Sequence, residues 1–155
     1  MIFTEEHEIS VALQPVADAY AADPATDVYN MKYYEHITFV IVEAAGGTGT
    51  VKIQVEECTS KAGAGNNAIA FKYRVKSDSN GAFGALTASA ATGYTTTAGA
   101  NKLVAVEVDA DDLAADSPYV RLQLTEVVND PCDAGVVAIL SKPRHPQATL
   151  AVSTS

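Results

Sequence analysis

Four aspartates crowd one short stretch of the chain, and carboxylates are the ligands that Ca²⁺ takes in proteins. They stand in the run DADDLAADS, at Asp109, Asp111, Asp112 and Asp116. The spacing departs from a calcium loop, because Leu113 occupies the place of a third ligand and no glycine follows. Aspartate also favours turns and helix starts. We therefore interpret the stretch as an acidic turn that caps a short helical segment, with weak Ca²⁺ binding left open, and we predict no metal or cofactor site.

The histidines give no recognisable catalytic arrangement. His7 lies in a polar N-terminal stretch, His36 at the start of a strand and His145 between two prolines. None of them neighbours a serine or cysteine in a nucleophile elbow such as GxSxG. The adjacent pair Glu56 and Glu57 would point to opposite faces of a strand, which is poor geometry for shared acid–base work. We predict no catalytic residues and expect that the protein is not an enzyme.

Two further groups of reactive or flexible residues have plain structural interpretations. The glycines of GGTGT follow one strand and precede another, so no helix N-terminus faces a phosphate there, and we predict a hairpin turn. Cys58 and Cys132 stand in no CxxC pair and have no histidine at zinc-ligand spacing. We expect two free thiols, with a bridge as the alternative if their Cα atoms come within about 7 Å.

Composition limits the classes of partner. The formal net charge is −9, and such an acidic chain is repelled by nucleic acid. Lys72, Arg74 and Lys76 form a small group of bases along the sequence, and they alternate with Phe71, Tyr73 and Val75, which predicts a strand with a basic outer face. No apolar run approaches the length of a membrane span, and the N-terminus MIFTEEHEIS carries acids where a secretory signal carries bases. We expect no nucleic-acid or membrane partner and synthesis in a cytoplasm.

The clearest secondary-structure pattern in the sequence is the stretch His36 to Cys58, which predicts two strands at the centre of the fold. In its first half Ile37, Phe39 and Ile41 alternate with other apolar residues, so both faces of the strand are apolar. This pattern predicts a central strand covered on both faces. In its second half Val51, Ile53 and Val55 alternate with polar residues, which predicts a half-buried strand paired with the first as a hairpin.

The rest of the chain reads as further short strands separated by turns. The clearest segments are residues 9–13, 28–34, 69–76, 102–108, 119–127 and 135–140. About eight strands with no long helix indicate an all-β fold. We predict a single antiparallel β-sandwich, jelly-roll-like, with an immunoglobulin-like sandwich as the alternative. Its divisions would be an N-terminal arm at 1–8, the sandwich at 9–142 and a C-terminal tail at 143–155.

Sugar binding is the remaining small-molecule hypothesis, because β-sandwiches often host it. Such sites present aromatic platforms, and the chain has no Trp. Tyr33 and Tyr34 would point to opposite sides of a strand and cannot form one platform. The other tyrosines that we considered are Tyr29, Tyr73, Tyr94 and Tyr119. Buried or interface positions are the more economical interpretation for them.

Several runs, taken together in their order, resemble a family of small structural proteins of tailed bacteriophages and prophages. They begin with AADPATDVYNMKYYEHITFVIVEAAGGTGTVKIQVEEC and continue with AIAFKYRV, GALTASAATGYTTTAGANKLVAVEVDADDL, YVRLQLTEV and AILSKPRHPQ. The resemblance extends from about Ala21 to Gln147 and contains no catalytic signature.

The resemblance implies a capsid decoration or cement protein. Such proteins are commonly β-rich and sit as trimers on the outside of the head, where they brace the shell. The expected partners are therefore the major capsid protein and further copies of this chain, and the expected location is the virion surface after synthesis in the bacterial host. From the residues themselves, we expect contacts at Ile2, Phe3, Lys72, Arg74, Lys76, Leu150 and Val152. The alternatives are a neck or tail protein, or a receptor- or sugar-binding module of the virion.

Overall fold

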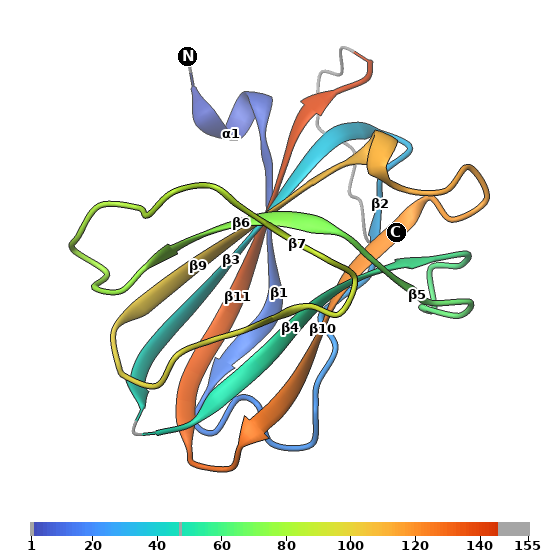
Figure 1. Ribbon diagram of the computed structural model, residues 1–155. Helices are drawn as coiled ribbons and strands as arrows, with labels where there is room; N and C mark the ends of the chain where they lie inside the picture. Colours follow the sequence, from blue (N-terminus) through green and yellow to red (C-terminus); the bar gives the residue numbers. More distant parts are fainter. Residues whose placement is uncertain (1, 47, 146–155) are drawn as a thin grey trace.

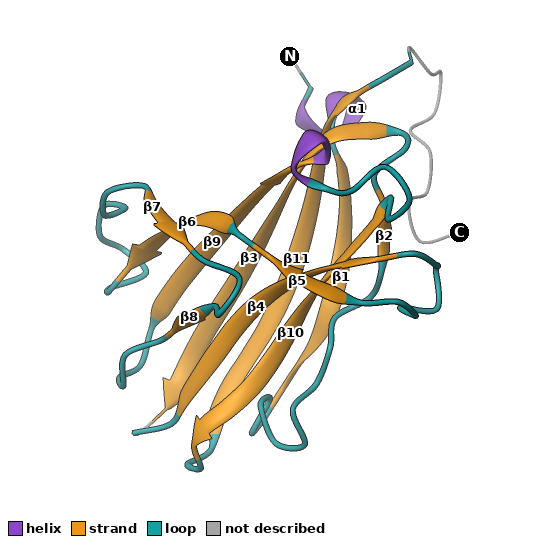
Figure 2. Ribbon diagram, turned by 45° about the vertical axis from the view of Figure 1, so that its right-hand side comes forward, coloured by secondary structure: helices purple, strands orange, loops and turns teal. Residues whose placement is uncertain are grey.

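Two antiparallel β-sheets face each other in the computed structural model, which describes residues 2–46 and 48–145 (Figures 1 and 2). The six-stranded sheet has the order β1 (Glu8–Val16), β11 (Cys132–Pro143), β3 (Tyr34–Gly46), β9 (Lys102–Asp109), β6 (Phe71–Lys76) and β7 (Thr87–Ser89). The five-stranded sheet has the order β2 (Tyr29–Asn30), β10 (Tyr119–Val128), β4 (Thr50–Cys58) and β5 (Asn67–Ile69), and β8 (Tyr94–Thr95) also pairs with β4. Two single turns of helix complete the fold, α1 (Phe3–Glu6) and the 3₁₀ turn η1 (Ala110–Asp112).

The strand order is that of a jelly roll, as predicted from the sequence. Strands β1, β2, β3 and β4 alternate between the two sheets, and β9, β10 and β11 alternate in the same way. As a result, β1, β11, β3 and β9 form the body of one sheet, and β2, β10, β4 and β5 form the other. The chain therefore crosses the sandwich at most of its long connections.

The predicted hairpin at His36 to Cys58 is wrong, because β3 and β4 lie in opposite sheets. β3 pairs with β11 and β9, whereas β4 pairs with β10, β5 and β8. The glycine-containing connection is thus an arch between sheets. At this arch a Cβ on Gly49 would stand 2.2 Å from the carbonyl oxygen of Asp130, and the backbone N–H of Thr48 donates to the Asp130 carboxylate at 2.7 Å. Glycine permits the close approach that brings the arch against this neighbouring loop.

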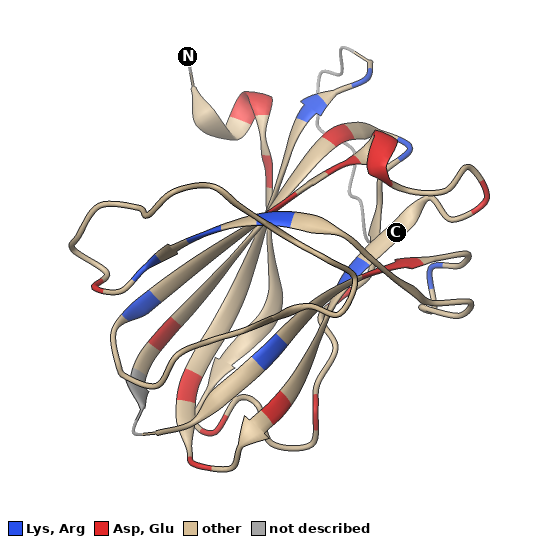
Figure 3. Cartoon of the chain, in the orientation of Figure 1, with Lys and Arg blue, Asp and Glu red and all other residues tan. Residues whose placement is uncertain are grey.

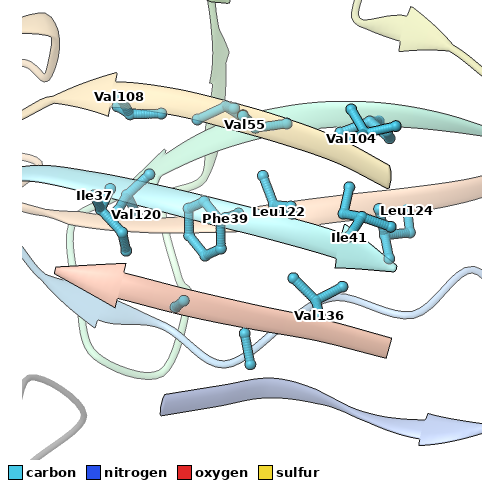
Figure 4. Packing of buried hydrophobic residues seen from close by; sticks show 14 of the residues in the cluster. Ile37, Phe39, Ile41, Val55, Val104, Val108, Val120, Leu122, Leu124 and Val136 are labelled. Carbon is cyan, nitrogen blue, oxygen red and sulfur yellow. The ribbon is translucent and has the colours of Figure 1, made fainter. Parts of the chain in front are cut away.

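The core lies between the sheets and is built from alternate residues of each strand. Ile37, Phe39 and Ile41 of β3 are fully buried and face residues of β10 (Figure 4). These partners are Val120, Leu122 and Leu124. Burial of each large side chain of this kind stabilises the fold by about 1.5–3 kcal/mol. The period of two predicted from the sequence therefore holds on the inner side of both sheets.

The N-terminal part of the chain differs from the sequence prediction in three details. Residues 3–6 form the short helix α1, where an arm without structure was expected. Only Tyr29 and Asn30 of the predicted strand 28–34 pair as β2, and Tyr34 already belongs to β3. β1 continues through Pro15, which is tolerated because β1 is the edge strand and needs no N–H there.

Candidate interaction surface

One side of the six-stranded sheet points away from the core, and its side chains form what we call the outer face. Residues paired across a ladder share a face, so the strand registers define its rows. The first row is Ile9, Ile139, Thr38, Glu107 and Lys72. The second is Val11, Val137, Val40, Ala105 and Arg74, and the third is Gly135, Val42, Leu103 and Lys76. Each row ends in a basic residue at β6, and the first two begin with an apolar residue of β1.

The apolar half of the outer face is open to solvent. Ile9 is 44% exposed, Val11 45% and Val42 43%, and the neighbouring Val40, Val137 and Ile139 are half-buried. The sequence prediction that β3 is covered on both faces is therefore wrong on this side, although β3 is central in its sheet as predicted. A two-layer sandwich covers one face of each sheet, and the second apolar face of β3 is left uncovered by the described residues.

A hollow of about 500 Å³ indents this apolar half near the N-terminal end of β11. Gly135 is one of its lining residues, and a Cβ at that position would stand 2.9 Å from Cγ of Pro15. The missing side chain lets Pro15 lie against β11, and the bulges of β1 occur in the same region. The other lining residues are almost all apolar: Val11, Leu13, Val16, Ala17, Val42, Ala44, Asp133, Ala134, Val136 and Val137.

The basic part of the outer face is β6. Lys72 and Arg74 are exposed and Lys76 is half-buried, and together these three residues form the basic strip (Figure 3). The Nζ atom of Lys76 lies 4.7 Å from the ring centroid of Phe83, which is itself 42% exposed. The strip stands out in a chain that carries 19 acidic and 10 basic residues.

The other outer side, on the five-stranded sheet, is mostly polar apart from the exposed Val127 and Val128 at the end of β10, and its polar groups make contacts within the chain. Arg121 of β10 bonds to Glu56 of β4 through both Nε and Nη2, each 2.8 Å from Oε2. The side-chain amides of Gln54 and Gln123 donate to the carbonyl oxygens of Ala91 and Asp23. These polar side chains therefore already have hydrogen-bond partners within the chain, some of them in its loops.

His36 is the residue that comes nearest to a catalytic arrangement. Its Nδ1 lies 2.7 Å from Asp109 Oδ1, its Nε2 lies 2.7 Å from Glu107 Oε2, and Thr38 Oγ1 is 3.3 Å from Nε2. A general base for Thr38 would need a free lone pair on Nε2. Both ring nitrogens face carboxylates instead, and the Thr38 hydroxyl donates to Glu107 at 2.8 Å.

The electrostatics of His36 follow from these contacts. The hydrogen bond to Glu107, followed by that to Asp109, raises the pKa of His36 against the opposing effect of burial. The same bond to His36 lowers the pKa of Glu107. A charged imidazolium that donates to two carboxylates is an ion-pair clasp between β3 and β9, placed on the open sheet and outside the hollow.

A second charged pair lies inside the sandwich near the arch. Glu43 is almost completely buried, and its Oε2 lies 3.1 Å from Lys102 Nζ, although without the geometry of a hydrogen bond. The Tyr20 hydroxyl donates to Glu43 Oε1 at 2.7 Å, and Lys102 also donates to the carbonyl oxygen of Thr97. Burial raises the pKa of Tyr20, and Glu43 adds to that rise. This network joins β3, β9 and the loop after β1.

The acidic turn serves as a cap, as predicted. The backbone N–H of Asp109 donates to the Asp112 carboxylate at 3.2 Å at the start of η1. The cysteines are the two free thiols that the sequence predicts, and both are buried. Burial, followed by the nearby Glu43, raises the pKa of Cys132 to about 11. Within residues 2–46 and 48–145, no group of three or more His, Cys, Asp or Glu side chains is arranged to hold a metal.

The tyrosines form no exposed platform among the described residues. Tyr34 is fully buried and Tyr33 is 42% exposed, which confirms that they point to opposite sides. Tyr73 and Tyr94 stack on each other at 4.2 Å and close one edge of the sandwich. Tyr29 is buried in the core, and Tyr119 is half-buried.

The predicted contact residues fall into separate places. Phe3 is exposed on α1 and Ile2 is exposed directly before it, and α1 lies beside β1 and β11. The basic strip is on β6, on the far side of β3 and β9. Leu150 and Val152 lie outside the described residues. The apolar residues between α1 and the strip were missed, although the two-sided apolar pattern of β3 was a usable signal for them.

The comparisons with known proteins give one fold neighbour. The SPBc2 prophage-derived protein YomS, known from a crystal structure, matches with a TM-score of 0.50 and 12% sequence identity. The match covers 88% of this chain and 94% of that chain. At this identity the match shows that the two chains share a fold.

Sequence comparisons add no relative. No protein-family model matches the chain, and no curated protein matches it. In the part of the chain that the structure describes, no helix is both long and apolar enough to cross a bilayer.

Proposed function

We propose that this protein is a structural component of a tailed-phage virion that binds the exterior of the head and stabilises the shell as a decoration or cement protein. The fold shared with a prophage-derived protein over nearly the whole of both chains supports a phage origin. The resemblance of the sequence runs to phage structural proteins supports the same origin independently. Its partners are the major capsid protein and two further copies of itself in a trimer.

The observation that carries the proposal is the open outer face of the six-stranded sheet. A small soluble protein rarely leaves a contiguous apolar surface uncovered unless another molecule covers it. This face combines three exposed aliphatic side chains of β1 and β3 with the basic strip on β6. Such a surface supports a role in binding to other proteins.

The arrangement of the polar groups supports a structural role over an enzymatic one. His36 is held as a clasp and has no free ring nitrogen with which to accept a proton. The hollow is lined almost entirely by aliphatic residues, and Asp133 is its one ionisable group. A position in the neck or tail of the virion is the second candidate, because the fold neighbour is described as prophage-derived without a location in the particle.

Binding to phage shells tests the proposal. Purified protein is added to empty shells of the phage or prophage that encodes it, after the shells have been stripped of bound accessory proteins. We expect stoichiometric, saturable binding and a higher temperature of shell disruption, and sedimentation of the free protein as a trimer. Protein that remains in the supernatant with shells, yet cosediments with isolated tails, moves the assignment to the tail.

A further inference from the structure

We propose that the outer face of the six-stranded sheet is the docking surface, and that it fits a protein surface that is apolar opposite β1, β11 and β3 and acidic opposite β6. The inference rests on the proposed function, because it takes the partner to be the phage shell. It adds which side of the sandwich faces that shell and what chemistry the shell must present there.

The apolar half supplies an anchor site. Val11 of β1 and Val42 of β3 line the hollow from the strands on either side of β11, and Gly135 and Pro15 line it as well. A protruding aliphatic or aromatic side chain of a partner would fill this indentation and exclude water from it. Side chains seated in such pockets carry most of the binding energy at protein interfaces.

The basic strip supplies orientation. Lys72 and Arg74 project from β6 in a chain of net charge −9, so an acidic partner is attracted at this strip and repelled by most of the remaining surface. Glu107 lies across the ladder from Lys72 and also interacts with Arg74. Its carboxylate is bonded to His36 and Thr38 as well, so this one acid offsets the three bases of the strip only in part. Charge complementarity of this kind selects one docking orientation and accelerates encounter.

A second copy of this face does not provide the required acids. In a twofold contact of the face with itself, β6 lies opposite either β6 or β1, depending on the direction of the axis. The first arrangement sets the basic strip against itself. The second sets it against Ile9 and Val11. Neither sets a row of acidic side chains opposite Lys72 and Arg74, so the charge pattern favours a different protein.

The opposite side of the sandwich does not compete for this role. Its Arg121 is already paired with Glu56, and its glutamine amides already donate to loop carbonyls. Docking through that side would break internal bonds or bury satisfied polar groups for no gain. The two sides therefore differ in what they offer a partner.

Shell binding by matched variants tests the inference. Val42→Asp places a charge on the apolar half, and Val127→Asp makes the same change at a residue that is 53% exposed on β10 of the other sheet. Arg74→Glu reverses one charge of the basic strip, and Lys61→Glu reverses an exposed charge in the loop after β4. Each variant is first checked for an unchanged melting temperature and an unchanged sedimentation coefficient.

We expect Val42→Asp to weaken shell binding about thirtyfold, the loss typical of a central interface residue. We expect Arg74→Glu to weaken it about tenfold and to reduce its dependence on salt concentration. Both control variants should bind within about twofold of the wild type.

Three results would overturn the inference. If the wild type binds shells and all four variants bind equally well, the shell-binding function stands and docking lies elsewhere. If Val42→Asp dissociates the protein's own oligomer, a second copy covers this face. If the wild type does not bind shells at all, the proposed function fails and this inference fails with it.

Discussion

The two outer sides of this sandwich are built on the same pleated pattern and have opposite chemistry. On the five-stranded sheet, Arg121 and Glu56 bond to each other, and Gln54 and Gln123 donate to carbonyl oxygens of nearby loops. On the six-stranded sheet, Val11 and Val42 face solvent, and the same outer face carries the basic strip on β6. The side whose polar groups bond within the chain contributes to the stability of the fold, and the open apolar side is the one where we propose that a partner binds.

The inner side of β3 provides the reference for this comparison. Phe39 is fully buried and meets Tyr29 edge to face, with ring centroids 5.7 Å apart. Phe39→Ala is expected to lower the free energy of unfolding by about 3–5 kcal/mol, because it removes buried contacts and leaves a cavity. Urea denaturation measures this loss. A change below about 1 kcal/mol would show that the core is not packed around this residue.

The five-stranded side should depend on its internal ion pair. Arg121→Met removes the partner of Glu56, whose side chain is only 13% exposed, and is expected to cost about 2 kcal/mol of unfolding free energy. Arg74→Met on the basic strip is the matched control and should leave the denaturation midpoint unchanged. Equal losses of unfolding free energy in Arg121→Met and Arg74→Met would mean that the ion pair on the five-stranded side contributes no more to stability than the basic strip does.

The clasp on the six-stranded side should make a smaller, pH-dependent contribution. The pKa of His36 is raised, so its stabilisation is complete below the unfolded value of 6.5 and is lost as pH rises through the folded value. The pKa of Glu107 is lowered, so its stabilisation is present above the unfolded value of 4.5 and is lost as pH falls through the folded value.

The two directions together predict a window of maximal stabilisation between pH 4.5 and 6.5. His36→Gln should lower the unfolding free energy there by about 1 kcal/mol or less, the usual range for partly exposed ion pairs. The loss should shrink on both sides of the window. Denaturation of both proteins from pH 3 to 9 gives this difference, and a constant loss across the range would mean that ionisation of His36 plays no part.

The smallest effect is expected on the apolar half of the outer face. Val42→Thr keeps the branched shape of an exposed side chain in a strand, so the unfolding free energy should change by less than about 0.5 kcal/mol. The same variant should bind shells more weakly than the wild type, because it places a hydroxyl at the edge of the hollow. If the outer face of the six-stranded sheet serves binding, a substitution at Val42 should weaken shell binding and leave the unfolding free energy almost unchanged.

Much of the fold could be predicted from the sequence, because a period of two directly reports the pleat. The alternation in β4, β9 and β10 correctly placed Val51, Val104 and Leu122 inside. The pairing of β3 with β4 could not be judged in this way, since alternation says which side a residue faces and nothing about the neighbouring strand. A jelly roll alternates its strands between sheets, so sequence neighbours are poor candidates for pairing partners.

The candidate surface could be predicted only in part from the sequence. The basic strip follows from the alternation of β6, and it lies on the outer side as predicted. The apolar half was misjudged because two-sided apolarity was taken to mean cover from within the chain. The buried pair Glu43 and Lys102 also had a signal, since each stands in phase with the buried residues of its strand. Their contact depends on the register of β3 with β9, which the sequence does not state.

Electron cryomicroscopy of shells with the protein bound would show which side of the sandwich meets the shell. We expect β1, β11, β3 and β6 to turn their outer face to the shell, with an apolar shell side chain in the hollow and shell carboxylates beside Lys72 and Arg74. A bound protein whose six-stranded sheet faces solvent, or whose contact is made through Arg121 and Glu56 of the other sheet, would contradict it.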